Sequence, residues 1–143
     1  MTTRAELSEI AEDVNGHTRL MRAALEGDTK TVKQLLASGS DVNARDGEGR
    51  TSLMFAVVNS HADTARELIR SGAYVNAADK DGGTALMLAA TSGDAEIVKE
   101  LLSAGANVAG RHKSSGATAI VLAKRAGHDD IAELLAGVEP GNK

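Results

Sequence analysis

The chain contains no cysteine and no tryptophan, and only one proline, one phenylalanine and one tyrosine among its 143 residues. Without cysteine, neither disulfides nor thiolate metal sites can form. With so few aromatic side chains, a core must be built from Leu, Ile, Val, Ala and Met, and hydrophobic residues in total make up 42% of the sequence. Small side chains of this kind suit closely packed helices.

The sequence also lacks any long apolar run, and its apolar stretches fall far short of the roughly 20 residues that a membrane-spanning helix needs. The N-terminus is charged from its start, at Arg4, Glu6 and Glu9, and does not resemble a signal peptide. The net charge of −4 is unremarkable and weighs against general nucleic-acid binding. We therefore expect a cytoplasmic protein that binds neither nucleic acid nor a membrane.

What the chain does have is an internal repeat with a step of 33 or 34 residues. A Thr-x-Leu-Met segment begins at Thr18, Thr51 and Thr84, and Thr118 begins a related Thr-Ala-Ile-Val segment. Leucine, glycine and valine positions recur at the same step, among them Gly39, Gly72 and Gly105. A period of this length indicates a stacked array, whose function lies in an extended binding surface.

Residues 79–110 are the most regular unit, and their pattern predicts a turn, a helix, a second turn and a second helix. Thr84 is a natural N-cap for a helix from Ala85 to about Ser92, which Gly93 can end in a left-handed conformation. A second helix is expected from about Asp94 to Ser103, with Gly105 after it. Alone, such a unit cannot bury its apolar face, so neighbouring units must cover it.

The motifs resemble the ankyrin repeat family. In that family a Thr-Pro-Leu-His segment is followed by Ala-Ala, Gly-His, Ile-Val…Leu-Leu and Gly-Ala-Asp-Val-Asn-Ala. Here these motifs read Thr84-Ala-Leu-Met-Leu-Ala-Ala, Gly93-Asp, Ile97-Val-Lys-Glu-Leu-Leu and Gly72-Ala-Tyr-Val-Asn-Ala. The resemblance implies an all-α ankyrin-repeat solenoid of stacked helix-turn-helix units, in which the turns project as β-hairpin-like finger loops.

The expected organisation is a capping helix, four repeats and a tail. Residues 1–14 carry a capping box and an apolar helical face, which predicts an N-terminal capping helix that covers repeat one. The ankyrin repeat domain is expected over residues 15–137, with repeats at about 15–45, 46–78, 79–111 and 112–137. Residues 138–143 are expected to form a flexible C-terminal tail.

Besides the missing proline of the Thr-x-Leu segments, three departures from the family pattern bear on structure and binding. Methionine or valine replaces the family histidine in each Thr-x-Leu segment, which exchanges a hydrogen bond for soft packing. Ser60 replaces the helix-ending glycine of repeat two, which predicts a turn that is either strained or loosened. Repeat four begins with one extra residue within 110–116, so we expect a longer or bulged finger that is basic and mobile.

By the resemblance, partner contacts come from the concave face made by the finger tips and the first helices. We expect a non-catalytic module that binds a protein or peptide partner of unknown identity, as a monomer and without cofactor or metal. The candidate partner-binding residues are Arg45, Glu48, Arg50, Val58, Asn59, Tyr74, Lys80, Asp81, Thr91, Ser92, Arg111, Lys113 and Arg125. Six cations against Glu48 and Asp81 leave +4 on this face, which favours an acidic partner segment.

Alternatives to these interpretations stay open. The finger charges can instead be solvated turn charges, and the whole chain a designed or generic scaffold without a dedicated ligand. Tyr74 occupies a normally polar position, where it can serve as a binding anchor or cover a neighbouring repeat. Phe55 reads as core, and the resemblance implies that His61 and His128 bond to the backbone of a neighbouring repeat. No spacing indicates a catalytic triad or a phosphate-binding loop.

Overall fold

The computed structural model describes residues 16–138, which form eight α-helices in four pairs. The pairs are α2 (Arg19–Glu26) with α3 (Thr29–Ala37), α4 (Ser52–Val58) with α5 (Ala62–Arg70), α6 (Ala85–Ser92) with α7 (Ala95–Ser103), and α8 (Ala119–Arg125) with α9 (Asp129–Ala136). The expected helix pair of repeat three is thus confirmed, with its second helix starting one residue late. The capping helix expected over residues 1–14 lies outside the described residues, as does all of the expected tail except Val138.

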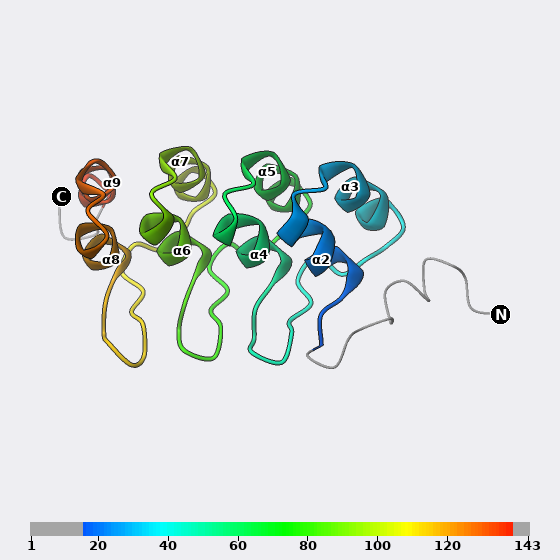
Figure 1. Ribbon diagram of the computed structural model, residues 1–143, viewed down its shortest axis with the longest axis horizontal. Helices are drawn as coiled ribbons and strands as arrows, with labels where there is room; N and C mark the ends of the chain where they lie inside the picture. Colours follow the sequence, from blue (N-terminus) through cyan, green and yellow to red (C-terminus); the bar gives the residue numbers. More distant parts are fainter. Residues whose placement is uncertain (1–15, 139–143) are drawn as a thin grey trace. The chain divides into compact units, whose positions relative to one another are not determined.

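The chain divides into two compact units at Tyr74 and Val75, and each described unit holds two helix pairs. Within the first unit α2 packs beside α4 and α3 beside α5, and within the second α6 packs beside α8 and α7 beside α9. Within each unit, the first helices form one layer, the second helices form another, and the loops extend beyond the first helices (Figure 1). Each helix pair therefore buries its apolar face against its neighbour.

A threonine caps the N-terminus of each first helix in the described structure, as the sequence predicted for Thr84. The side-chain oxygens of Thr18, Thr51, Thr84 and Thr118 each accept a hydrogen bond from the backbone amide three residues later. Asp28 and Asp94 cap α3 and α7 in the same way. These caps satisfy amides that a helix leaves without an internal partner.

Asparagine side chains join successive repeats within each unit. In the first unit, Asn43 donates from Nδ2 to the carbonyl of Gly72 at 3.1 Å and accepts from the amide of Tyr74 at 2.8 Å. In the second unit, Asn76 makes the same two bonds with Gly105 and Asn107, at 3.1 and 2.7 Å. One side chain thus pairs two backbone groups of the next repeat.

The helix-ending position shows where one repeat is strained. Gly27, Gly93 and Gly127 adopt φ values of 72, 83 and 83°, in the left-handed region that glycine enters without steric cost. Ser60 takes the same place in repeat two with a φ of 58°, and it is the sole non-glycine residue with positive φ within residues 16–138. Of the two outcomes expected at Ser60, this φ indicates strain, because a Cβ atom disfavours the left-handed conformation.

We expect Ser60→Gly to raise the free energy of unfolding by about 0.5–1 kcal/mol, because it removes the left-handed penalty and costs some chain entropy. Urea denaturation followed by circular dichroism measures the change. Gly127→Ser is the matched control, since a Cβ atom at Gly127 meets nothing within 4 Å and adds strain alone. That control should lower stability by a similar amount. An unchanged midpoint for Ser60→Gly would contradict the strain.

Candidate functional site

The three finger loops in the described structure are defined here by equivalent residues. Finger two is residues 45–50, finger three is residues 78–83, and finger four is residues 111–117, which carries the extra residue. The backbone closes each finger with one hydrogen bond of 2.9 Å, from the amide of Asp46 to Arg50, of Asp79 to Gly83, and of His112 to Ala117. The span is four residues in the first two fingers and five in finger four, so the expected longer finger is confirmed.

A buried carboxylate organises finger two. The side chain of Asp46 is fully shielded from solvent. Its Oδ1 accepts the amides of Glu48 and Arg50 at 2.9 and 2.8 Å. Its Oδ2 lies 2.8 Å from Nε of Arg50 and 3.1 Å from Nε2 of His17. One side chain therefore fixes the loop, the arginine that ends it and the neighbouring repeat.

The environment of Asp46 keeps its carboxyl group ionised. Burial by itself would raise the pKa of Asp46, because removing a charge from water is costly. The hydrogen bonds from the amide and guanidinium of Arg50 and from the amide of Glu48, with the positive charge of Arg50, outweigh burial and lower the pKa below its ordinary value of 3.8. Asp46 therefore stabilises the fold as an anion.

The Arg50 side chain contacts His17 and Phe55 as well as Asp46, and it is also partly exposed to solvent. Its guanidinium carbon lies 5.2 Å from the ring centre of Phe55, in a cation–π arrangement, and its Nη2 lies 3.4 Å from Nε2 of His17. The His17 and Phe55 rings meet edge to face with centres 5.4 Å apart. Phe55 is 9% exposed, which confirms its assignment to the core. Arg50 is thus a structural residue of finger two that keeps partial exposure.

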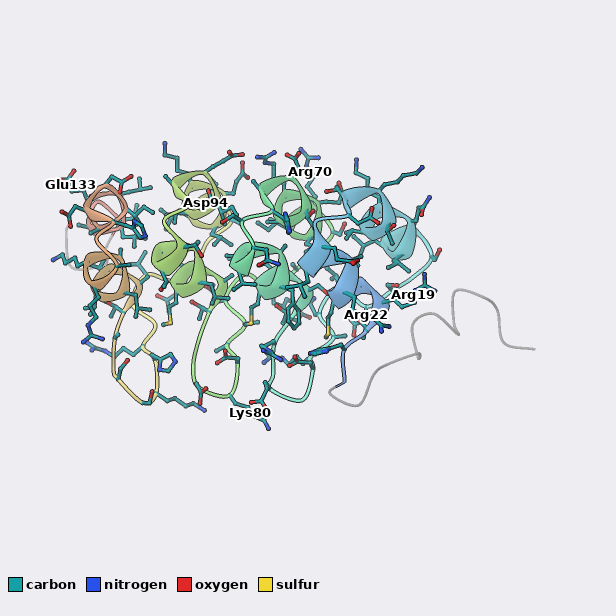
Figure 2. The ribbon with its side chains drawn as sticks, viewed as in Figure 1. Arg19, Arg22, Arg70, Lys80, Asp94 and Glu133 are labelled. Atoms are coloured by element: carbon teal, nitrogen blue, oxygen red, sulfur yellow. The ribbon has the colours of Figure 1, made fainter. Side chains whose placement is uncertain are left out.

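Finger three uses the same carboxylate device with different surface residues. Oδ1 of Asp79 accepts the amides of Asp81 and Gly83 at 2.9 and 2.8 Å. Lys80 and the side chain of Asp81 are exposed at the finger tip, and Lys80 extends from the end of the loop in Figure 2. Finger three therefore presents one cation and one acid beyond the acid that shapes it.

Finger four has histidine at the position of that carboxylate. Nδ1 of His112 lies 3.0 Å from the hydroxyl of Ser114, and Nη1 of Arg111 donates to the carbonyl of Gly116 at 3.1 Å. Arg45 makes the equivalent bond in finger two, from Nη1 to the carbonyl of Gly49 at 3.3 Å. Arg45 and Arg111 are therefore exposed but already engaged within their own fingers.

The candidates at the ends of the first helices separate into two kinds. Val58 is 45% exposed at the end of α4, whereas Asn59 donates from Nδ2 to the carbonyl of Leu25 at 2.8 Å. In α6, the hydroxyls of Thr91 and Ser92 bond to carbonyls one turn earlier in the same helix, at 2.9 Å each. Of these four residues, Val58 alone presents an apolar side chain to solvent.

The histidines that begin the second helices bond to a neighbouring repeat. Nε2 of His61 lies 3.0 Å from the carbonyl of Leu25, and Nε2 of His128 lies 3.2 Å from the carbonyl of Thr91. Each ring covers a glycine, because a Cβ at Gly27 or Gly93 would lie 2.5 Å from it. The structural role expected for His61 and His128 is confirmed. Within residues 16–138 no three His, Cys, Asp or Glu residues form a metal-binding group.

Tyr74 lies at the end of the first unit and is 67% exposed. Its amide is held by Asn43, so the backbone at this position is fixed while the ring extends into solvent. Arg125, the last residue of α8, is also exposed. Both candidates are therefore accessible to a partner.

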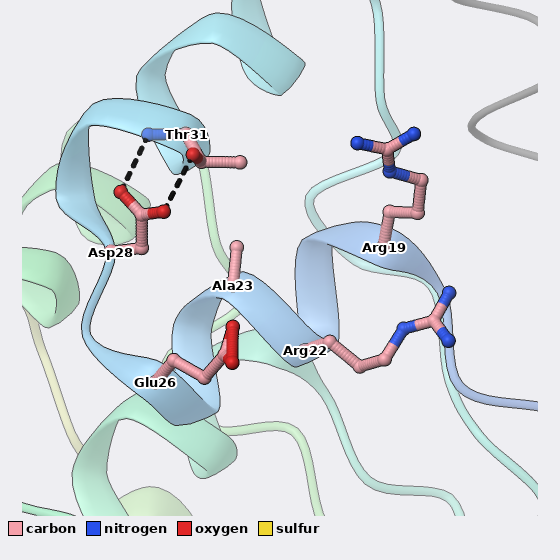
Figure 3. Close-up of a pocket in the computed structure, with 6 residues that line it drawn as sticks. All are labelled: Arg19, Arg22, Ala23, Glu26, Asp28 and Thr31. Carbon is pink, nitrogen blue, oxygen red and sulfur yellow. Dashed lines mark hydrogen bonds between the residues drawn. The ribbon is translucent and has the colours of Figure 1, made fainter.

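Sequence reasoning missed a hollow of about 580 Å³ on the surface of the first repeat. Arg19, Arg22, Ala23 and Glu26 of α2 line it with Asp28 and Thr31, as Figure 3 shows. The Asp28 carboxylate accepts the hydroxyl and amide of Thr31 at 2.7 and 3.1 Å, and these bonds lower the pKa of Asp28. The hollow is open and carries charges of both signs. Its only sequence signal is the spacing of Arg19, Arg22 and Glu26 along one helix face.

Comparison with known families decides what these helix pairs and fingers are. A family model described as ankyrin repeats (3 copies) matches residues 5–79 and 53–143. The chain belongs to the ankyrin repeat family. Its fold class is the all-α repeat solenoid, and proteins of this family generally mediate protein–protein interaction and are typically non-catalytic. No curated protein matches the sequence significantly.

The ankyrin repeat assignment accounts for the recurrence of the threonine caps, glycines and histidines from repeat to repeat, because these residues stabilise the stack. None of the helices within residues 16–138 combines the length and apolar character needed to cross a bilayer. The side chains that remain exposed beside the fingers are the candidates for partner contact.

Asp46 generates a pH-dependent prediction. Because its pKa is lowered in the folded state, its stabilisation is present above the unfolded value of about 3.8 and is lost as the pH falls through the lower folded pKa. We expect Asp46→Asn to lower the free energy of unfolding by about 2 kcal/mol at neutral pH, and by less near pH 3. Urea denaturation at both pH values measures this difference.

Asp63→Asn is the matched control for that experiment. The Asp63 carboxylate pairs with Arg66 at 2.8 Å, but its side chain is 83% exposed, and exposed pairs contribute little. The control should stay within about 0.5 kcal/mol of the parent chain at both pH values. A loss for Asp46→Asn that is equally large at both pH values would show that its charge is not the cause.

Proposed function

We propose that this ankyrin repeat protein binds a protein or peptide partner through the surface of its fingers and first helices, and that the partner segment is acidic. The observation that carries the proposal is the unequal use of charges in the fingers. The carboxylates of Asp46 and Asp79 accept hydrogen bonds from backbone amides of their own fingers, whereas Lys80, Lys113 and Arg125 are exposed. The surface therefore offers cations more readily than anions.

The candidate residues divide by the contacts that they already make. Arg45, Arg50, Asn59 and Arg111 bond within the fold, and the hydroxyls of Thr91 and Ser92 bond within their helix. In this proposal these residues hold the surface in shape. Direct contacts come from the remaining candidates, whose side chains are exposed and do not make bonds of this kind within residues 16–138: Lys80, Asp81, Lys113, Arg125, Val58, Tyr74 and Glu48.

The turn acids reduce the charge expected for this surface. In the first unit Arg45 and Arg50 are balanced by Asp46 and Glu48, which leaves 0. In the second unit Lys80, Arg111, Lys113 and Arg125 stand against Asp79 and Asp81, which leaves +2, so the turn acids lower the sequence count of +4 to +2. The buried Asp46 neutralises the neighbouring Arg50 in particular. A charge of +2 on a chain of net −4 still favours an acidic partner by electrostatic steering.

The second candidate is a scaffold without a dedicated ligand. The equivalent bonds of Arg45 and Arg111 to the carbonyls of Gly49 and Gly116 favour it, because they give two of the cations a role inside the fingers. That role does not extend to Lys80, Lys113 or Arg125.

Under either function we take the chain as a cytoplasmic monomer. Its repeats lie at about 15–45, 46–78, 79–111 and 112–137, and its capping helix in residues 1–14.

Selection from a random peptide library tests the proposal against the scaffold alternative. The full chain should enrich peptides with clustered Asp and Glu, and this enrichment should be lost in the variant that combines Lys80→Glu, Lys113→Glu and Arg125→Glu. These three side chains are exposed, so the variant should retain its helical circular dichroism spectrum.

Two outcomes would overturn the proposed function. One is that no peptide is enriched over an empty support. The other is that the parent chain and the triple variant enrich the same peptides. A single-stranded oligonucleotide added as competitor separates acidic peptide binding from general anion binding. It should not displace the peptides, because the described surface offers no row of exposed aromatic side chains for base stacking.

A further inference from the structure

The three fingers differ in net charge more than in shape. Finger two has two arginines and two acids and is neutral, while finger three has Lys80 between Asp79 and Asp81 and carries −1. Finger four has Arg111 and Lys113 and no acid, because His112 replaces the turn carboxylate, and it carries +2. The positive charge of the fingers is therefore concentrated in the one finger with an extra residue.

The second unit reinforces this concentration, because its charges are segregated between its two helix layers. Its fingers and first helices, in residues 78–93 and 111–127, hold five cations and two acids, which leaves +3. The rest of the described unit from residue 94, in 94–110 and 128–138, holds one cation and six acids, which leaves −5. Lys80 at a finger end and Asp94 and Glu133 at the second helices illustrate this division (Figure 2).

The backbone of finger four is tied to finger three, which fixes the base of Lys113. The amide of Lys113 donates to the carbonyl of Asp81 at 2.7 Å. A Cβ atom at Gly82 would lie 2.9 Å from the carbonyl oxygen of Arg111 and 3.3 Å from Cγ of Lys113, so the lysine stem crosses the bare glycine backbone. Gly82 also has a φ of 82°, which favours glycine. Lys113 is thus held at its backbone and along its stem.

The ammonium group of Lys113 is exposed and makes no ion pair within residues 16–138. Lys124 and Arg125, in the last turn of α8, are also exposed in the same repeat. A cation whose stem is already ordered loses less conformational entropy on binding than a free lysine does. Finger four therefore presents a lysine whose backbone and Cγ are placed by finger three, and finger four itself contains no acid.

We propose that finger four is the docking element for the acidic segment of the partner, with Lys113 as its principal contact. This inference rests on the proposed function and assigns it to one loop. The occupant is an extended peptide segment rich in Asp and Glu, whose carboxylates meet Lys113 in finger four. His112 is a specificity residue, because a carboxylate at its position would repel such a segment.

A pair of single variants tests the assignment, since Lys80 and Lys113 occupy the same position in fingers three and four. The probe is a short fluorescein-labelled glutamate-rich peptide, with a glutamine-rich peptide as the neutral counterpart. We expect Lys113→Glu to weaken binding of the acidic probe about tenfold and Lys80→Glu about twofold, because Asp79 and Asp81 already flank Lys80. Fluorescence anisotropy at low and physiological salt measures both, and the difference should shrink at the higher salt.

His112→Asp gives a second, independent readout. It places a carboxylate where Asp79 accepts two backbone amides in finger three, so the thermal midpoint should not fall. Affinity for the acidic probe should fall about fivefold, because the charge of the finger drops. A lower affinity with an unchanged midpoint supports the docking role, whereas an unchanged affinity overturns it.

The outcomes separate this inference from the proposed function. If the triple variant loses the selected peptides but Lys113→Glu weakens the probe no more than Lys80→Glu does, finger four is not the docking element and the proposed function stands. If the parent chain binds the acidic and neutral probes equally, the acidic partner itself is wrong. If an oligonucleotide binds more tightly than the acidic peptide, and Lys113→Glu abolishes this, the occupant is a nucleic acid.

Discussion

Fingers two and three depend on the hydrogen bonds that a turn aspartate accepts from the backbone of its own loop. In fingers two and three one oxygen of an aspartate accepts two backbone amides, which a tight loop would otherwise leave unpaired. The cost of burying Asp46 is offset because Arg50 and the loop amides stabilise its anion. Both carboxylates keep their negative charge, so each also offsets a cation of its own finger. One device therefore shapes the finger and decides which cations a partner can meet.

Much of the fold could be predicted from the sequence because its determinants are local. A threonine cap, a glycine at positive φ and an apolar stripe act within a few residues, and they recur at each repeat. The roles of His61 and His128 followed from the resemblance. The Asp46, Arg50, His17 and Phe55 cluster could not be predicted, because it joins positions in successive repeats whose pairing depends on side-chain geometry. The hollow beside Arg19 and Arg22 lies within one repeat, but it depends on how α2 and the start of α3 are placed in space, which the spacing of residues does not give.

The candidate site was predicted less completely than the fold, and Arg50 shows why. Its position in a finger indicated a surface cation, and the sequence gives no sign that a buried anion lies 2.8 Å from its Nε. Asn59 was selected as an exposed residue, yet its amide bonds to the carbonyl of Leu25. Sequence identifies which residues reach the finger face. It does not identify which of these side chains already bond within the fold. Only the side chains without such bonds are fully accessible to a binding partner.

Positions that recur in every repeat and positions that depart from the repeat therefore contribute differently to this protein. A repeated position is constrained by the neighbour that it must fit, so its residue type reports on the stack. A position that departs from the pattern either adds strain, as Ser60 does, or changes the surface, as His112 does. Replacing an acid that binds amides with histidine removes a stabilising anion from finger four and leaves Arg111 and Lys113 uncompensated. In finger four the amide of Ala117, which is equivalent to the amides of Arg50 and Gly83, donates to Oγ of Ser115 at 3.2 Å, so a serine hydroxyl replaces the missing carboxylate there.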